Sequence, residues 1–288
     1  MERLRVAIDR ARAARDGTQD PHAAKGGAAS VKRTATAAKA EPADAQRWRE
    51  SWDAVEGFDI PPRQLERQRI VAAKGPGKGM PEAIAFDKLR TRVTQEMRAK
   101  GWKRLAITSP GPNCGKSTIA LNLGFTFARR DDERVVLLEM DLRRPSLARI
   151  AGLSTRKDFA EVLRGEGAFT DHAVRLDEKL AMGAVRSPRP RSAELLQSRS
   201  AAVALDAIEE AFDPTIMIFD TAPVLSSDDT LGFLDRIDCV LIVAAAGTTS
   251  IAEIDNAERE VAAHSKVLGV VLNKCEYADE TGKYDYYS

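Results

Sequence analysis

Short apolar runs alternate with amphipathic segments along the chain from about Pro81 onward. Apolar runs of strand length predict strands at residues 104–110, 134–141, 215–220, 239–246 and 267–273. Apolar residues at helical spacing predict helices at residues 81–99, 115–130, 192–212 and 250–265. The apolar stripe of the first helix consists of Ile84, Leu89, Val93 and Met97. Continuously apolar strands that alternate with helices are typical of a parallel sheet covered on both faces. The pattern therefore predicts a three-layer α/β fold with a mostly parallel central sheet, which occupies residues 81–275.

The N-terminal part of the chain shows a different pattern. Residues 1–17 place Leu4, Ile8 and Ala11 at helical spacing on an arginine-rich segment, which predicts a short basic helix. Such a helix is either solvated and marginally stable or serves to dock on a partner. Residues 18–80 lack a sustained period, so we expect a flexible linker and a largely disordered N-terminal region.

Two tryptophans interrupt this linker. Trp48 and Trp52 are four residues apart and would share one face of a short helix. That face either binds a partner or folds back on the α/β domain, and we favour the second interpretation.

The composition narrows the class of protein only slightly. A formal net charge of +1 gives no sign of extensive binding to nucleic acid or to a membrane surface, so no nucleic-acid partner is expected. The three cysteines are widely spaced, which predicts neither a disulfide framework nor a zinc site. No apolar run approaches the roughly 20 residues needed to cross a bilayer, and the N-terminus lacks the apolar core of a signal peptide. We expect a soluble, cytoplasmic protein.

A candidate phosphate-binding loop lies between the first predicted strand and the helix that follows it. The segment "TSPGPNCGKST" contains a Gly-Lys-Ser core, although Pro110 occupies the position where the pattern has its first glycine. In such a loop, backbone N–H groups face the phosphates, the lysine reaches the β- and γ-oxygens, and the serine binds Mg²⁺. The residues expected to bind nucleotide here are Gly111, Pro112, Asn113, Cys114, Gly115, Lys116, Ser117 and Thr118. A structural turn is the alternative, and the strand and helix on either side disfavour it.

Acidic residues end two of the other predicted strands. Glu139 and Asp141 end one of them, and Asp220 ends another. Because parallel strands finish at one edge of the sheet, these carboxylates should converge on the magnesium ion and the γ-phosphate. Asp141 could alternatively cap a helix without any chemical role. We expect a site for a magnesium nucleotide, with ATP and Mg²⁺ as cofactors.

All four tyrosines of the chain lie within its final residues. Tyr277, Tyr284, Tyr286 and Tyr287 stand among Asp, Glu, Gly and Lys in a segment without apolar period. Tyrosine usually serves cores and interfaces, where its ring buries area and its hydroxyl finds a partner. The composition of residues 276–288 instead indicates a flexible tail.

These segments together resemble the bacterial tyrosine kinases of polysaccharide export, in the form whose cytoplasmic P-loop kinase is a separate chain from its membrane activator. The resemblance rests on "TSPGPNCGKST" as Walker A, "VVLLEMDLRRPSL" as Walker A′, "IMIFDTAPVL" as Walker B with its D-x-x-P, and on "SAELLQS", "LGVVLNK" and the tyrosine cluster. It covers residues 82–288, and the chain's start also looks like the start of such kinases.

The resemblance implies a role for each matching residue. It implies that Lys116 and Ser117 bind phosphate and Mg²⁺. It implies that Asp141 and Asp220 hold the metal ion and its water ligands. It makes Glu139, where the family usually has Asp, a catalytic base or metal partner, and Asp141 is the other candidate base. The E-x-x-R-x-x-R motif that the family associates with ring assembly falls on Ile84, Asp87 and Arg90. Only the last agrees with the motif, so no ring is assumed.

The resemblance also accounts for the tyrosines, as acceptors of phosphate in an autokinase. The last predicted strand ends near Asn273, which we expect to contact the nucleotide, and Tyr284 lies eleven residues further on. Eleven extended residues reach up to roughly 35–40 Å, enough to enter the active site of a neighbouring copy. The implied partners are that second copy and a transmembrane activator, or co-polymerase, which would hold the chain at the inner membrane and link it to exopolysaccharide or capsule synthesis.

Three alternatives stay open at this stage. A partition-type ATPase of the deviant-Walker class would carry a signature lysine at the position of Gly111, which is absent here. A GTPase is suggested by "NKCE" at residues 273–276, which resembles the guanine motif N-K-x-D. An ATP-binding adaptor of the polysaccharide machinery, with weak or no kinase activity, would share the same site, since Pro110 and Glu139 depart from the pattern.

Overall fold

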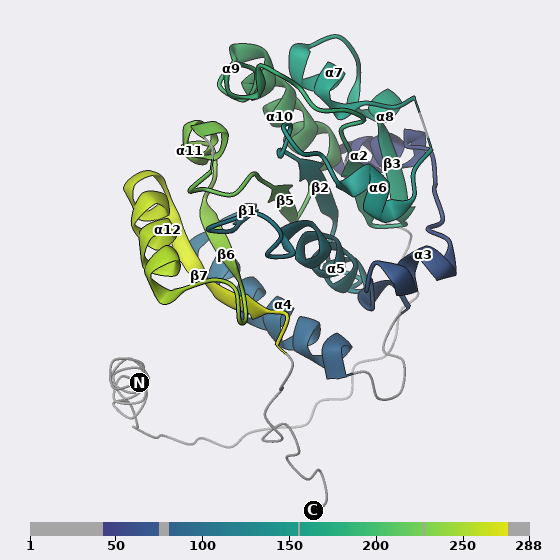
Figure 1. Cartoon of the computed structure of the whole chain (residues 1–288). Coiled ribbons are helices and arrows are strands. Elements are labelled where there is room, and N and C mark those ends of the chain that lie inside the picture. The colour runs from purple at the N-terminus through teal and green to yellow at the C-terminus, as the bar shows by residue number, and fades with distance from the viewer. Residues whose placement is uncertain (1–42, 75–80, 155, 227, 276–288) are drawn as a thin grey trace, which may run out of the picture. The chain divides into compact units, whose positions relative to one another are not determined.

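A computed structural model describes residues 43–74, 81–154, 156–226 and 228–275 (Figure 1). In chain order, its elements are α2 (Ala43–Ala54), α3 (Pro62–Arg67), the 3₁₀ helix η1 (Ala72–Lys74), α4 (Pro81–Lys100), β1 (Arg104–Thr108), α5 (Lys116–Ala128), β2 (Val135–Glu139), α6 (Leu147–Ala151), α7 (Phe159–Arg164), α8 (Phe169–His172), β3 (Ala173–Asp177), β4 (Leu180–Gly183), α9 (Ser192–Leu196), α10 (Arg199–Phe212), β5 (Ile216–Asp220), α11 (Asp228–Leu234), β6 (Cys239–Ala245), α12 (Ile251–His264) and β7 (Lys266–Asn273).

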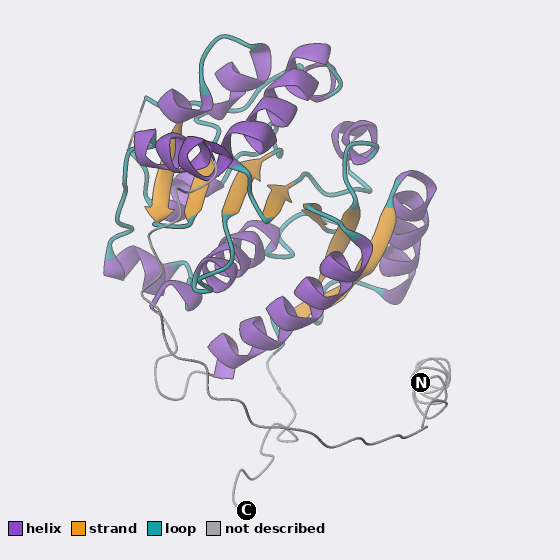
Figure 2. Ribbon diagram, turned by 180° about the vertical axis from the view of Figure 1, so that it is seen from behind, coloured by secondary structure: helices purple, strands orange, loops and turns teal. Residues whose placement is uncertain are grey.

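Seven strands form one sheet in the order β3-β4-β2-β5-β1-β6-β7. All neighbouring strands are parallel except β3 and β4, which form an antiparallel pair at one edge. Helices cover both faces of the sheet (Figure 2). The predicted three-layer, mostly parallel α/β fold is confirmed.

Each central strand contributes to two hydrophobic cores, one on each face of the sheet. In β1, Leu105 and Ile107 belong to one core, whereas Ala106 belongs to the other. The same alternation holds along β2, β5 and β6, because successive side chains of a strand point to opposite faces. This two-sided burial explains why these strands are apolar throughout.

The edge hairpin of β3 and β4 was not among the predicted elements. Its strands have five and four residues, and β3 carries Arg175 and Asp177 within a short apolar stretch. Such short segments give little periodic signal, so the interval between β2 and α9 could not be assigned from the pattern.

The predicted helix over residues 192–212 is two helices. Ser198 lies between α9 and α10, and its side chain accepts a hydrogen bond from the N–H of Ala201. A serine that caps a helix in this way starts a new helix rather than continuing the previous one.

The predicted apolar stripe of α4 is correct except at its start. Val93 and Met97 are buried and Leu89 packs against the core, but Ile84 is 53% exposed. Ala83 and Phe86 face the core in its place.

The prediction of a flexible linker is wrong for residues 43–74. These residues form α2, α3 and η1, and Trp52, Val55 and Ile70 are buried. The indole Nε1 of Trp52 donates to the carbonyl of Phe212 at 2.9 Å, which confirms that the tryptophan folds back on the domain. The pattern missed this because three short pieces, rather than one long helix, supply the apolar contacts.

The predicted helix at 1–17 and the tyrosine tail at 276–288 lie outside the described residues. Among the helices that the structure describes, none is long and apolar enough to cross a membrane.

Candidate nucleotide site

The carboxyl ends of the parallel strands bring the predicted site residues to one edge of the sheet. Glu139 at the end of β2 lies opposite Asp220 at the end of β5, which in turn lies opposite Ile107 of β1. The backbone N–H groups of Met140 and Asp141 both donate to the carbonyl of Asp220, at 2.8 and 3.0 Å. Ligands of open α/β sheets bind at such a carboxyl edge.

The predicted phosphate loop connects β1 to α5 at this edge. Asn113 and Gly115 have positive φ angles of 62° and 95°, so the loop turns tightly before the helix begins at Lys116. No side chain caps α5, and the N-terminus of a helix with free N–H groups attracts anions. The loop therefore has the backbone geometry that phosphate binding requires.

Glycine is required at position 115 for two reasons. Its φ lies in the left-handed region, and a Cβ there would lie 2.2 Å from Nδ2 of Asn273. That Nδ2 donates to the carbonyl of Cys114 at 2.8 Å. Asn273, which we expected at the nucleotide, instead braces the phosphate loop from the end of β7.

Two of the predicted loop residues, Gly111 and Cys114, do not line the cavity described below. They make contacts within the loop instead. The Cys114 side chain is buried, and its Sγ lies 3.3 Å from the carbonyl of Gly111 and 3.6 Å from the Thr249 hydroxyl. The same Gly111 carbonyl accepts from the Ser109 hydroxyl at 2.6 Å. These contacts hold the loop's shape from within.

A cavity of about 870 Å³ opens beside the loop. It is lined by Gln68, Pro112, Asn113, Gly115, Lys116, Ser117, Thr118, Asp141, Arg143, Arg144, Pro145, Ser146, Arg149, Ile150, Pro188, Ala222, Pro223, Ser226 and Lys274. The volume lies in the range of ordinary ligand sites. Six of the eight residues predicted from the loop line it, and Asp141 joins them.

Asp220 lies beneath the loop and is fully buried. Neither of its carboxylate oxygens has a hydrogen-bond partner among the described residues. Burial raises the pKa of Asp220 to about 7, while the positive charge of Lys116 and the nearby Ser117 hydroxyl lower it. A buried carboxylate without a partner is costly, and a bound cation would compensate it.

Asp141 differs from Asp220 because it faces the cavity. Burial raises the pKa of Asp141, and the charge of Lys116 opposes that rise. One of its oxygens accepts from the N–H of Arg144 at 3.0 Å, which fixes the turn after β2. Asp141 also lines the cavity, so its carboxylate is available to a ligand there.

Glu139 does not take the position predicted for it. It is fully buried and outside the cavity, and its carboxylate accepts from three backbone N–H groups, those of Ser146, Leu147 and Val185. Burial and the charge of Asp220 raise its pKa to about 8, although the backbone donors oppose this. The prediction of Glu139 as a catalytic base is corrected: both oxygens are engaged in holding the segments that follow β2 and β4.

The donors that remain suit a magnesium ion. Ser117, Asp141 and Asp220 supply one hydroxyl and two carboxylates, and magnesium commonly binds one or two carboxylates together with phosphate oxygens and water. The two oxygens of Asp220, which have no hydrogen-bond partner among the described residues, are the observation that supports this fit. Within the described ranges no group of three or more His, Cys, Asp or Glu side chains could hold a metal alone. The phosphates of the nucleotide would therefore have to complete the ligand set.

An arginine at the rim of the cavity was not among the predicted site residues. Arg143 donates from Nε and Nη2 to the two oxygens of Asp229, at 2.8 and 3.0 Å. The Ser192 hydroxyl donates to Asp229 at 2.6 Å. The run "LRRP" after the acidic residues was the available signal for Arg143, but nothing in the pattern pointed to its partner on α11.

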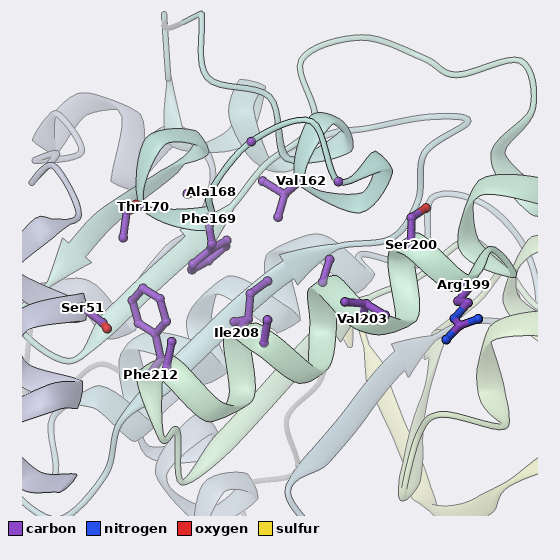
Figure 3. Close-up of a pocket in the computed structure, with 15 residues that line it drawn as sticks. Ser51, Val162, Ala168, Phe169, Thr170, Arg199, Ser200, Val203, Ile208 and Phe212 are labelled. Atoms are coloured by element: carbon purple, nitrogen blue, oxygen red, sulfur yellow. The ribbon is translucent and has the colours of Figure 1, made fainter.

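A second cavity of about 610 Å³ lies away from the phosphate loop. Figure 3 shows Phe169, Val203, Ile208 and Phe212 around it, with side chains from α7, α8 and α10. None of the residues predicted for nucleotide binding lines it.

A strand, a tight loop and a helix that present a buried lysine and a serine to a cavity at the carboxyl edge of a parallel sheet define a P-loop nucleotide-binding protein. The chain belongs to the family of the CobQ/CobB/MinD/ParA nucleotide binding domain, whose model matches residues 105–286.

Several curated proteins are similar in sequence. The succinoglycan biosynthesis transport protein ExoP of Rhizobium meliloti (strain 1021) is 32% identical over 208 residues, which cover 70% of this chain and 26% of ExoP. The tyrosine-protein kinase ptk of Acinetobacter johnsonii is 31% identical over 66% of this chain and 26% of its own length. The chain thus spans about a quarter of these two relatives. The tyrosine-protein kinase YwqD of Bacillus subtilis (strain 168) is 29% identical over 78% of this chain and 94% of its own length.

Solved structures confirm the fold. The chimerical protein CapA2B2 superposes with a TM-score of 0.65 and 23% identity, covering 77% of this chain and 93% of its own. The kinase domain of the Escherichia coli tyrosine kinase ETK gives a TM-score of 0.63 and 23% identity, covering 76% of this chain and 85% of its own.

Proposed function

We propose that the chain is an ATP-dependent protein-tyrosine autokinase, which phosphorylates its own C-terminal tyrosines and acts in the synthesis and export of an exopolysaccharide or capsule. The relatives named above as tyrosine-protein kinases and as a succinoglycan transport protein support this class of activity. A separate transmembrane co-polymerase would activate the chain and hold it at the inner membrane.

One structural observation carries the proposal. Strand β7 ends at the nucleotide edge, where Asn273 braces the phosphate loop and Lys274 lines the cavity. The tyrosine segment therefore begins at the mouth of the site, and Tyr277 follows Lys274 by three residues, or at most roughly 11 Å of chain. The phosphate donor and the acceptor hydroxyls are thereby tethered to the same edge.

Different residues of the site would bind the phosphates, hold the metal ion and accept the proton during phosphoryl transfer. Lys116 and the loop N–H groups would hold the β- and γ-phosphates, and Ser117, Asp141 and Asp220 would hold Mg²⁺, which neutralises charge on the transferred group. A tyrosine hydroxyl oxygen attacks the γ-phosphorus, and the bond to the β–γ bridging oxygen breaks as ADP takes the electron pair. The hydroxyl proton passes to Asp141, because Glu139 has both oxygens bonded to backbone donors.

The sequence of the guanine motif disfavours the GTPase alternative. Glu276 stands where the motif N-K-x-D has aspartate.

An ATP-binding adaptor without turnover is the second candidate function. The occupied carboxylate of Glu139 favours it, because the first acidic residue of the A′ segment supplies no base here.

The test is incubation of the full chain with magnesium and ATP, followed by mass spectrometry for phosphotyrosine, with and without the cytoplasmic segment of a candidate membrane partner. We expect phosphate on the tail tyrosines. Lys116→Met should lower the rate by about a hundredfold or more, as expected when a transition-state charge partner is removed.

A variant with all four tyrosines replaced by Phe is the matched control. It should bind ATP normally and contain no phosphotyrosine. Nucleotide binding with no phosphotyrosine in the unaltered chain, even with the partner segment present, would leave the adaptor as the function.

A further inference from the structure

The cavity is lined by far more positive than negative charge. Its basic side chains are Lys116, Arg143, Arg144, Arg149 and Lys274, and its one acidic side chain is Asp141. Lys116 begins α5 at the phosphate loop, and the backbone N–H of Arg144 donates to Asp141 at 3.0 Å, so both residues lie on the phosphate and metal side. Arg143, Arg149 and Lys274 remain for a second anionic group.

An ion pair with the buried Asp229 fixes the side chain of Arg143. Asp229 is completely buried, and it accepts both N–H groups of a bidentate pair from Arg143 while Ser192 donates to it as well. The Arg143 side chain itself is 53% exposed. A planar guanidinium fixed on one edge keeps its rotamer without further loss of side-chain entropy when a ligand binds to the other edge.

Arg143 lines the cavity. Its Nη1 donates to no group in the part of the chain that the structure describes. Both N–H groups of Nη1 and the second N–H of Nη2 are therefore left for an incoming carboxylate or phosphate, for which arginine has a matching geometry.

Three of the four tyrosines have an acidic residue directly next to them in the sequence. Glu276 directly precedes Tyr277, and Asp285 lies between Tyr284 and Tyr286. Adjacent residues are about 3.8 Å apart along the chain, so the flanking carboxylate arrives beside the site together with the tyrosine ring.

We infer that Arg143, positioned by Asp229 and Ser192, determines substrate specificity by binding a carboxylate that directly flanks the acceptor tyrosine. The substrate class is an acidic tyrosine-containing segment, and the occupant is the C-terminal segment of a second copy of this chain. The inference rests on the proposed kinase function and adds to it the residue that selects the substrate.

The test compares two fluorescent peptides on a full-length chain whose four tyrosines are replaced by Phe. One peptide has the sequence of residues 276–288, and the other has the amides Gln and Asn in place of its four acidic residues. Affinities are measured by anisotropy with a non-hydrolysable ATP analogue and Mg²⁺, and KM values for peptide and for ATP are measured with ATP. The chain's own tail competes with both peptides alike, so the ratio between peptides is the result that matters.

We expect the acidic peptide to bind about tenfold more tightly, as one well-placed charged contact allows. Arg143→Ala should reduce that ratio to less than about threefold with the KM for ATP changed by less than about twofold. Arg143→Lys should retain part of the preference for the acidic peptide. Asp229→Asn keeps the arginine but weakens the ion pair that fixes its side chain, so this variant should lose most of the preference. Arg259→Ala, on the exposed side of α12, is the matched control and should keep the full ratio.

Equal affinity for the two peptides would overturn the inference. A rise in the KM for ATP that matches the rise for the peptide would also overturn it, because Arg143 would then serve the nucleotide. Selective binding without any phosphotyrosine would leave the specificity site standing while the kinase proposal fails.

Discussion

Glu139 shows how a carboxylate can take part in a site without touching the ligand. Its three backbone hydrogen bonds hold the segment after β2, which carries Arg143 and Ser146 to the cavity, and the start of the segment after β4. A carboxylate that accepts several backbone N–H groups fixes local geometry as a helix cap does. Glu139 therefore stabilises the backbone around the cavity without lining it, whereas Asp141 lines the cavity itself.

These two roles give different mutational effects. Glu139→Gln places an NH₂ group against backbone N–H donors, so we expect a loss of about 1–3 kcal/mol in the free energy of unfolding. The turnover per folded molecule should fall less than about tenfold. Asp141→Asn should keep stability and lower turnover by about a hundredfold or more. Urea unfolding and single-turnover kinetics separate the two effects, and a hundredfold loss in stable Glu139→Gln would restore that residue as the base.

The loop residues were predicted from sequence because their chemistry is local. Gly115, Lys116 and Ser117 work through backbone geometry and position on α5, which a short motif specifies. Glu139 and Asn273 could not be assigned correctly, since their partners lie in segments remote in sequence and the hydrogen-bond donors are backbone groups that any residue carries.

At the level of the elements, α2 changes the boundary of the domain. Trp52 is buried to 3% exposure, packs edge-on against Phe212 with ring centroids 5.5 Å apart, and donates to the Phe212 carbonyl. Its neighbour Trp48 lies under the guanidinium of Arg134, 4.6 Å from the ring centroid. The sequence placed a domain start at Pro81 because the long amphipathic pattern begins there, yet the core includes residues well before it.

We predict that Trp52→Ala lowers the free energy of unfolding by about 3–5 kcal/mol, the usual range for a large buried aromatic side chain. A Trp52→Phe variant should retain much of the packing but not the hydrogen bond. Its free energy of unfolding should therefore lie between those of the unaltered chain and the alanine variant. Urea denaturation followed by circular dichroism measures the series. A loss below about 1 kcal/mol in the alanine variant would show that α2 is dispensable.

A truncated chain that begins at Pro81 should be markedly less stable than one that begins at Glu41. The shorter chain lacks Trp52, Val55 and Ile70, so it exposes the apolar surfaces they cover on both faces of the sheet. Thermal unfolding of the two chains checks this, and equal melting temperatures would contradict it.

For the whole molecule, the strands and most long helices could be predicted because two-sided burial makes them apolar and periodic. The interval between β2 and α9 could not, since its elements have four to six residues each and owe their structure to contacts made elsewhere. Phe159 and Phe169 of this interval, for example, pack edge to face in the core formed with α10.

The buried carboxylates predict a pH dependence of stability in the absence of nucleotide and metal. The pKa values of Glu139 and Asp220, about 8 and about 7, lie above their ordinary values, so the folded state holds protons that the unfolded chain has lost. Their contribution is fully present below about pH 4 and is lost as the pH rises through 7 and 8. The melting temperature should therefore fall between about pH 5 and pH 8 and change little above that.

Magnesium and a nucleotide should reduce this fall, because a cation next to Asp220 favours the ionised carboxylate. Asp220→Asn should raise the melting temperature of the nucleotide-free protein at pH 8 and flatten its pH profile. Differential scanning calorimetry across this pH range provides the measurement. A flat profile in the unaltered chain would show that the two carboxylates are compensated by other means.

Phosphorylation should also change self-association. Each phosphate adds about −1.5 to −2 charges to a segment that already contains Glu276, Asp279, Glu280 and Asp285. We expect the modified segment to leave the neighbour's site through repulsion and product release, so the assembly loosens. Light scattering before and after saturating phosphorylation tests this, and an unchanged size distribution would oppose it.

One amide group connects the phosphate loop to the end of the last strand. Asn273 Nδ2 donates to the carbonyl of Cys114, directly before Gly115. The phosphate loop and the strand that leads to the tyrosine segment are therefore connected by this hydrogen bond. We therefore expect nucleotide binding at the loop to affect the end of β7, from which the chain continues to the tyrosines.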